Sequence, residues 1–126
     1  MASKPILVVD DEPIVRESIR DWLKDAGYQV ATAESGEEAL EMIKKQDFSV
    51  VILDVRLPGK TGIMVLKEVK ALKPEMKSII ITAYPTAELS DEARRLGAVD
   101  YLIKPVAPDD LERLIRETLL KCETEE

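Results

Sequence analysis

The stretch Phe48-Ser-Val-Val-Ile-Leu-Asp54-Val-Arg-Leu-Pro-Gly59 decides how the rest of this sequence is interpreted. Five of the six residues from Val50 to Val55 are apolar, and the exception is Asp54. So short and apolar a run is typical of a strand that is covered on both faces of a parallel sheet. A lone carboxylate inside such a strand would be costly to bury, whereas at the last residue it can look out of the sheet edge. Ligands of open parallel sheets bind at the carboxyl ends of the strands, so Asp54 is the first candidate functional residue.

The overall composition predicts one soluble globular domain. A chain of 126 residues leaves room for a single domain, and 45% hydrophobic with 34% charged residues is typical of soluble proteins. No apolar run approaches the roughly 18 residues of a membrane span, and we expect neither a signal peptide nor membrane association. The single cysteine, Cys122, cannot form an internal disulfide, which fits a reducing cytoplasm.

Charge and histidine content narrow the classes of function. The net charge of −7 argues against direct nucleic-acid binding by this domain and favours a site for a metal cation. The sequence contains no histidine, which excludes histidine-based catalytic triads and zinc–histidine sites.

Five apolar, strand-like segments alternate with five helical patterns along the chain. The predicted strands are residues 5–10, 28–33, 48–54, 77–82 and 99–103, and successive strands begin 20 to 29 residues apart. That spacing is the length of one strand–helix unit. Five such units predict an α/β fold with a five-stranded parallel sheet and helices on both faces. The pattern itself leaves the order of the strands open.

Punctuating residues mark the limits of the helices. Pro13 is suited to the first turn of the first helix, and Gly27 is suited to its end. Either Thr86 or Ser90 would cap the fourth helix, which has the thinnest apolar face, so we expect it to be the most mobile element. The inward faces predicted for the first, third and fourth helices consist of Val15, Ile19, Trp22, Leu23 and Ala26; Val65, Leu66, Val69 and Leu72; and Leu89, Ala93 and Leu96.

Polar residues stand at the ends of four of the five predicted strands, and a parallel sheet brings those ends to one edge. They are Asp10 with Asp11, Asp54, Thr82 and Lys104. Clustered carboxylates raise one another's pKa unless a cation intervenes, and Mg²⁺ is the natural hard, oxygen-preferring partner. A carboxylate beside Mg²⁺ can attack a phosphoryl group and form an aspartyl phosphate, with a lysine and a threonine hydroxyl supporting the phosphoryl oxygens.

Each of these residues also has a simpler structural interpretation. Asp10 and Asp11 could cap a turn before a helix, Asp54 could be a solvated strand end, and Lys104 could be an ordinary surface lysine. Thr82 is a common residue in strands and could be a packing residue. Their joint occurrence at four strand ends favours the functional interpretation.

The chain resembles the receiver domains of bacterial two-component response regulators. The matching motifs are Val9-Asp10-Asp11-Glu12, Leu53-Asp54 with Leu57-Pro58-Gly59, Thr82-Ala83, and Gly97-Ala98-x-Asp100-Tyr101-Leu102-x-Lys104-Pro105. Each motif alone is weak, but all of them in this order and at these spacings are highly specific. The resemblance covers about residues 4–121 of a single domain, 1–126, and leaves 122–126 as an acidic tail. It implies a flavodoxin-like fold with strand order 2-1-3-4-5, in which the first and third strands meet at the ligand crevice.

The resemblance also implies how a phosphoryl group would be received. Asp54 would accept it from the phosphohistidine of a sensor histidine kinase, or from a phosphotransfer protein. Asp11 would bind Mg²⁺ directly and Asp10 partly through water. Asp54 and the backbone carbonyl of Arg56 would complete the protein ligands.

A second group of residues would convert phosphorylation into a change of surface. Thr82 would be the switch hydroxyl that moves toward the phosphate, Lys104 would pair with the phosphate, and Tyr101 would swing inward when Thr82 moves. The bond between Lys104 and Pro105 is expected to be cis, a state tolerated before proline. The face of the fourth helix, fifth strand and fifth helix would then shift between two packings and serve as a surface for partners or for a homodimer.

Two positions depart from relatives in a way that concerns the lifetime of the phosphoryl group. They are Arg56, two residues after Asp54, and Tyr84, two residues after Thr82. In the family these positions tune hydrolysis by water. A large Tyr84 would shield Asp54, so we hypothesise a longer-lived phosphoryl group than in relatives with small or acidic residues there.

Other functions require similar atoms. A Mg²⁺-dependent phosphatase with an aspartate nucleophile would need a second Asp two residues after the first, where Arg56 stands. A receiver-like scaffold that is never phosphorylated would not need Asp54, Lys104 and the acidic pair. We therefore predict a cytoplasmic phosphoacceptor that is no enzyme beyond its own phosphorylation and dephosphorylation. The sequence leaves open whether it acts alone or regulates a DNA-binding or ATPase domain.

Overall fold

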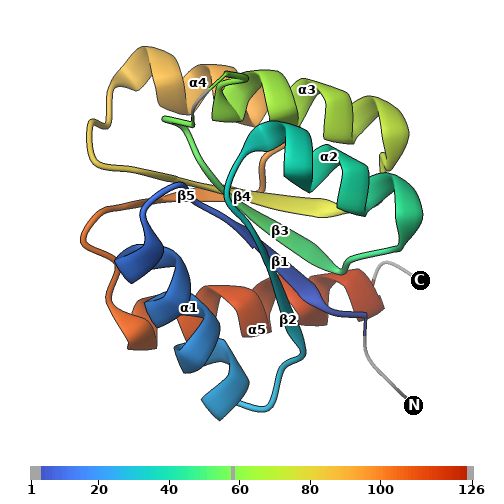
Figure 1. The fold of residues 1–126 in the computed structure, drawn as a ribbon, viewed down its shortest axis with the longest axis vertical. Coiled ribbons are helices and arrows are strands. Elements are labelled where there is room, and N and C mark those ends of the chain that lie inside the picture. The colour runs from blue at the N-terminus through green and yellow to red at the C-terminus, as the bar shows by residue number, and fades with distance from the viewer. Residues whose placement is uncertain (1–3, 58, 125–126) are drawn as a thin grey trace.

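Five parallel strands form the single sheet of the computed structural model, which describes residues 4–57 and 59–124. The strands are β1 (Ile6–Val9), β2 (Val30–Ala33), β3 (Val50–Asp54), β4 (Lys77–Thr82) and β5 (Asp100–Ile103). Their order is β2-β1-β3-β4-β5, which places β3 at the centre of the sheet (Figure 1). The predicted α/β class, the parallel sheet and the strand order are therefore confirmed.

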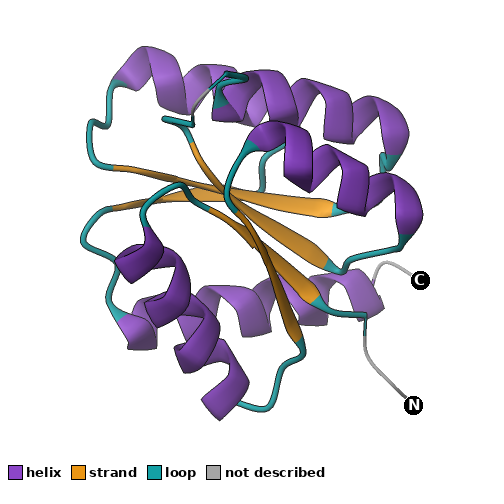
Figure 2. Ribbon diagram, in the orientation of Figure 1, coloured by secondary structure: helices purple, strands orange, loops and turns teal. Residues whose placement is uncertain are grey.

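Five helices alternate with the strands and cover both faces of the sheet (Figure 2). They are α1 (Pro13–Asp25), α2 (Gly36–Lys45), α3 (Gly62–Leu72), α4 (Ala87–Arg95) and α5 (Pro108–Thr124). Helices α2, α3 and α4 lie on one face, and α1 and α5 lie on the other (Figure 1).

Two hydrophobic clusters lie between the sheet and these helix layers. In β1, Leu7 and Val9 point into the cluster beneath α2–α4, whereas Ile6 and Val8 point into the cluster beneath α1 and α5. All four are fully buried. A strand that is covered on both faces has no polar side, which explains why the sequence shows continuous apolar runs instead of alternation.

The helix limits follow the residues that punctuate the sequence. α1 begins at Pro13, and Gly27 follows it with a φ of 99°, a conformation that glycine adopts without strain. α4 is capped by Thr86, whose hydroxyl accepts a hydrogen bond from the backbone N–H of Leu89 at 3.0 Å. Of the two candidate caps, Thr86 is therefore the one used, and Ser90 lies inside the helix.

Some expectations about the apolar faces are wrong. Leu72 is 44% exposed and Ala26 is exposed, although both were expected to face inward. Leu72 is the last residue of α3 and Ala26 is the C-cap of α1, so helical periodicity continues to these positions where the helix ends. Val15 and Trp22 are half buried at the margin of the second cluster.

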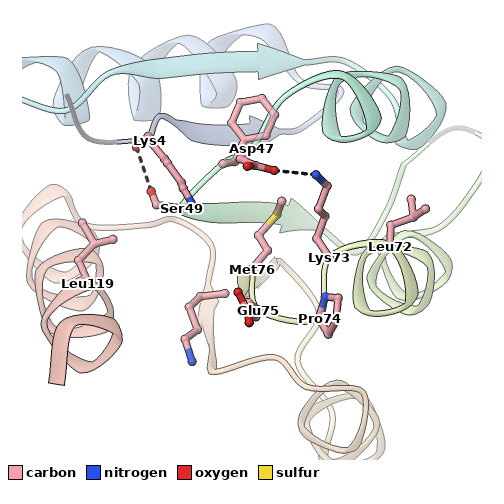
Figure 3. Close-up of a pocket in the computed structure, with 11 residues that line it drawn as sticks. Lys4, Asp47, Ser49, Leu72, Lys73, Pro74, Glu75, Met76 and Leu119 are labelled. Carbon is pink, nitrogen blue, oxygen red and sulfur yellow. Dashed lines mark hydrogen bonds and ion pairs between the residues drawn. The ribbon is translucent and has the colours of Figure 1, made fainter. Parts of the chain in front are cut away.

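A pocket of about 790 Å³ lies at the amino-terminal edge of the strands, opposite the edge where Asp54 ends β3. Leu72, Met76 and Leu119 line it. Lys73 and Asp47 also line it and form an ion pair of 2.6 Å (Figure 3). None of the helices in the described part of the chain is long and apolar enough to cross a membrane.

Candidate functional site

Asp54 is the last residue of the central strand and is almost completely buried, with 3% of its surface exposed. Its Oδ1 atom accepts a hydrogen bond from the backbone N–H of Arg56 at 3.1 Å. Val9 of β1 pairs with Leu53 of β3, so the residues that follow each strand leave the sheet side by side. This register brings Asp10 and Asp11 next to Asp54, as the sequence predicts.

Four carboxylates converge at this edge of the sheet. Asp10, Asp11, Glu12 and Asp54 each offer one oxygen, and these oxygens lie within 4.8 Å of one another. Asp10 and Asp54 are buried, whereas Asp11 and Glu12 are exposed. Closely spaced carboxylates repel one another strongly unless positive charge lies among them.

Lys104 places an ammonium group among these carboxylates. Its Nζ lies 2.9 Å from Asp54 Oδ2, 2.9 Å from Glu12 Oε1 and 3.1 Å from Asp10 Oδ2. The contacts with Asp54 and Glu12 are hydrogen-bonded ion pairs, and the contact with Asp10 is an ion pair. Burial by itself would lower the pKa of Lys104, but the contacts with the three carboxylates outweigh it and raise the pKa above its usual value.

Lys104 directly follows β5, and its backbone is hydrogen-bonded to the end of β4. The Lys104–Pro105 peptide bond is cis. The backbone N–H of Lys104 donates to the carbonyl of Thr82 at 2.8 Å, which ties the end of β5 to the end of β4.

Asp10 is the carboxylate with the most unfavourable surroundings. Burial raises its pKa to about 6; a hydrogen bond from the backbone N–H of Glu12 opposes this, and the charge of Asp54 adds to it. The Glu12 N–H donates to Oδ1 at 2.9 Å. The other oxygen, Oδ2, is buried and accepts no hydrogen bond from the described residues. Its contact is the ion pair of 3.1 Å with Lys104 Nζ. One ammonium balances only part of the charge of four converging carboxylates, so the cluster fits a hard divalent cation such as Mg²⁺.

The residues predicted to tune phosphate lifetime contact each other. The guanidinium carbon of Arg56 lies 4.1 Å from the centre of the Tyr84 ring, a cation–π arrangement. The backbone N–H of Tyr84 donates to Thr82 Oγ1 at 3.0 Å, and Thr82 is buried at the end of β4. Tyr84 itself is 61% exposed. This contact joins the β3–α3 loop, whose Arg56 backbone N–H is bonded to Asp54, to the β4–α4 loop.

Tyr101 lies apart from the carboxylate cluster. It belongs to β5, is half buried and packs against the hydrophobic cluster beneath α2–α4. Asp10, Asp11, Asp54 and Lys104 are thus brought together, whereas Tyr101 stands farther away on the edge strand.

Sequence reasoning missed the part that Glu12 plays in the cluster. Glu12 stands in the matched motif but received no role, although its carboxylate binds Lys104. A signal was present, because Glu12 extends the acidic pair that directly follows an apolar strand.

Known proteins are similar to this chain over most of its length. The family model described as "Response regulator receiver domain" matches residues 6–116. The transcriptional regulatory protein ZraR of Escherichia coli K12 is 44% identical over 118 residues, which are 90% of this chain and 26% of that protein. The alginate biosynthesis transcriptional regulatory protein AlgB of Pseudomonas aeruginosa is 41% identical over 84% of this chain and 24% of that protein. The chain thus spans about a quarter of the length of these curated relatives.

Solved structures show the same fold. A CheY-like response regulator receiver domain protein from Methanospirillum hungatei JF-1 has a TM-score of 0.96 and 35% identity, with 99% of this chain and all of that chain covered. NtrX from Brucella abortus has a TM-score of 0.91 and 31% identity, and the match covers 98% of this chain and 29% of that one. The family match, the strand order and the grouping of acidic residues with a lysine lead to one conclusion. This chain belongs to the response regulator receiver domain family.

Proposed function

We propose that this domain is a phosphorylation-dependent switch and that Asp54 is its phosphoacceptor. The observation that carries the proposal is the surroundings of the Asp54 carboxylate. One oxygen is held by the Arg56 backbone N–H and the other by Lys104, beside three further carboxylates. An oxygen of Asp54 would attack the phosphorus of a phosphohistidine. The P–O bond would form as the P–N bond breaks, and the nitrogen would leave with the electron pair.

We propose that Mg²⁺ is the cofactor of this reaction. Asp10, Asp11, Asp54 and the backbone carbonyl of Arg56 would hold it, and the convergence of four carboxylates within 4.8 Å supports this assignment. When bound, the cation would supply positive charge to the phosphoryl oxygens. Lys104 would hold a phosphoryl oxygen from the other side, through the ammonium that already contacts Asp54.

Phosphorylation would then change the face formed by α4, β5 and α5. A phosphoryl group brings up to about two negative charges, which would attract the hydroxyl of Thr82 and the ammonium of Lys104. The hydroxyl of Thr82 accepts a hydrogen bond from the backbone N–H of Tyr84, in the loop before α4. The carbonyl of Thr82 accepts one from the backbone N–H of Lys104. Movement of Thr82 would therefore reach both the β4–α4 loop and the end of β5, where Tyr101 would follow.

The partners follow from this role. A sensor histidine kinase or a phosphotransfer protein would supply the phosphoryl group in the cytoplasm, and the α4-β5-α5 face would contact an output domain or a second copy. The domain would comprise residues 1–126, with a core of about 4–121, and would not itself contact nucleic acid. Control of transcription by a longer regulator is supported by the names and lengths of ZraR and AlgB.

A Mg²⁺-dependent phosphatase is not favoured, because Arg56 stands where its second aspartate would be.

The test is incubation with Mg²⁺ and acetyl phosphate, followed by intact-mass measurement. The wild type should gain one phosphate, and Asp54→Ala should gain none. Asp47→Ala is the matched control, because Asp47 lies at the opposite edge of the sheet and should leave the modification unchanged. An unmodified wild type, or an Asp54→Ala variant that still gains a phosphate, would refute the proposal.

A further inference from the structure

Arg16 is a buried arginine whose guanidinium contacts the backbone of the carboxylate cluster. It lies in the first turns of α1 with 9% of its surface exposed. A guanidinium is rarely so deeply buried unless its donors have partners. Its Nη1 donates to the backbone carbonyl of Asp10 at 2.8 Å, and its Nη2 donates to Glu34 Oε1 at 3.3 Å.

These two bonds join the segments that follow neighbouring strands. Asp10 stands directly after β1, and Glu34 stands directly after β2. Glu34 is in turn fixed to α2, because its backbone N–H donates to Glu38 Oε1 at 2.7 Å. Arg16 therefore ties the turn that carries the acidic pair to the β2–α2 segment.

Asp10 is held at three points, one of which is the hydrogen bond of 3.2 Å from its backbone N–H to the carbonyl of Ala33. Arg16 holds its carbonyl, and the Glu12 N–H holds its Oδ1. Its Oδ2 lies in the cluster, 3.1 Å from Lys104 Nζ. The bond to the carbonyl also sets the plane of the Asp10–Asp11 peptide, and so the direction in which the chain carries Asp11 away from the sheet.

We propose that Arg16 is a positioning residue that presents Asp10 and Asp11 to the divalent cation. This inference rests on the proposed function, since it concerns the metal site of the same reaction. Arg16 does not touch the cluster oxygens itself. It acts through the backbone of Asp10.

The geometry requires arginine instead of lysine. A guanidinium offers donors in a rigid planar fork and can serve two acceptors on different segments at once. A lysine at position 16 would keep the positive charge but would have one nitrogen for both the Asp10 carbonyl and Glu34. The substitution Arg16→Lys therefore separates positioning from charge.

The experiment is titration of the unphosphorylated protein with Mg²⁺ by calorimetry. Arg16→Lys should weaken Mg²⁺ binding by about 10-fold, the scale found when groups that orient metal ligands are altered. The matched control is Arg20→Lys, because Arg20 lies one turn farther along α1 and, among the described residues, forms its ion pair with the exposed Asp21. Arg20→Lys should bind Mg²⁺ as the wild type does.

The rate of phosphorylation by acetyl phosphate, measured as a function of Mg²⁺ concentration, separates positioning from a general loss of structure. Arg16→Lys should need more Mg²⁺ but reach nearly the wild-type rate at saturation. Unchanged Mg²⁺ affinity in Arg16→Lys would overturn the proposal, as would a reduced saturating rate with normal affinity. If Arg16→Lys does not fold, Glu34→Ala removes the exposed half of the bridge instead. It should weaken Mg²⁺ binding in the same direction, and an unchanged affinity would count against the proposal.

Failure of the proposed function would look different from failure of this inference. A wild type that binds Mg²⁺ but never gains a phosphate would refute the phosphoacceptor role. The comparison of Mg²⁺ affinities between Arg16→Lys and Arg20→Lys would still decide the role of Arg16.

Discussion

Burial of the Asp10 carboxylate raises its pKa, so its charge should affect stability without Mg²⁺. Its pKa is raised from 3.8 to about 6, which means that the folded protein holds this proton more tightly than the unfolded chain does. The contribution of Asp10 to stability is therefore lost as the pH rises from about 4 to 6. We expect Asp10→Asn to be more stable than the wild type at pH 7, by on the order of 1 to 3 kcal/mol.

The measurement is thermal unfolding of both proteins between pH 4 and pH 8. The difference in melting temperature should be small at pH 4 and should grow until about pH 6. Added Mg²⁺ should raise the melting temperature of the wild type much more than that of Asp10→Asn. A wild type that is the more stable protein at pH 7 without Mg²⁺ would contradict this account.

Tyr84 and Arg56 are expected to control access of water to a phosphorylated Asp54. Their cation–π contact joins the loops that follow Asp54 and Thr82, although Tyr84 is largely exposed. Tyr84→Ala or Tyr84→Glu should therefore speed the loss of phosphate, and Arg56→Ala should act in the same direction. The decay of the phosphorylated species is followed by intact mass after removal of acetyl phosphate. Unchanged or slower loss in the Tyr84 variants would refute the shielding hypothesis.

At the scale of elements, Gly62 sets how closely α3 approaches the end of β3. A Cβ atom at this position would stand 2.3 Å from the carbonyl oxygen of Asp54 and 2.8 Å from Val55 Cα. Both are backbone atoms, so the clash is relieved only by moving the helix or the strand end. Gly62→Ala should destabilise the fold by about 1 to 3 kcal/mol, the usual cost of overpacking. Urea unfolding measures this, with Lys67→Ala on the exposed face of the same helix as a control that should stay near wild type.

Helix α4 should be the element that opens most readily. Ala93 is its single buried residue, whereas α2 and α3 each bury four. Few buried contacts mean a low free energy of local opening. In hydrogen exchange followed by mass spectrometry, amides of α4 should exchange faster than those of α2 and α3. Equal protection of the three helices would show that α4 gains stability from contacts other than its buried face.

The elements could be predicted from the sequence because each one carries its own local signal. The strands are short apolar runs, and Pro13, Gly27 and Thr86 mark helix limits. The strand order could not be derived from those runs, because they are all apolar and any two would pair. It came from the resemblance, which joins motifs that are distant in sequence.

The candidate site was predictable for residues at strand ends and less so for contacts between loops. Asp10, Asp54 and Lys104 meet because parallel strands end at one edge. The Arg56–Tyr84 contact and the bridge from Arg16 to Glu34 depend on side-chain directions in separate segments, which no local pattern encodes. The inward orientation predicted for Leu72 is wrong because helical periodicity does not show where a helix ends, and Leu72 is the last residue of α3.

At the scale of the whole molecule, we expect the edge of the sheet at β5 to form part of a contact with a second copy. β5 is an edge strand, and Val99 beside it is 43% exposed. We expect phosphorylation to favour a dimer through the α4-β5-α5 face, and Val99→Glu should weaken it. Leu72→Glu is the control, because Leu72 is equally exposed at the distant pocket. Sedimentation velocity with and without acetyl phosphate measures the dimer, and a phosphorylated protein that stays monomeric would contradict the expectation.

The two ends of the described fold lie on the same side of the sheet, away from the carboxylate cluster. β1 begins at Ile6 and α5 ends at Thr124 at the amino-terminal edge of the sheet, whereas Asp54 stands at the carboxyl edge (Figure 1). Because the chain ends and Asp54 lie at opposite edges of the sheet, the domain can be attached through its ends while a protein contacts Asp54. Immobilised on a biosensor chip through a tag at either terminus, it would present Asp54 to the solution, and phosphodonor proteins could be passed over a uniformly oriented layer.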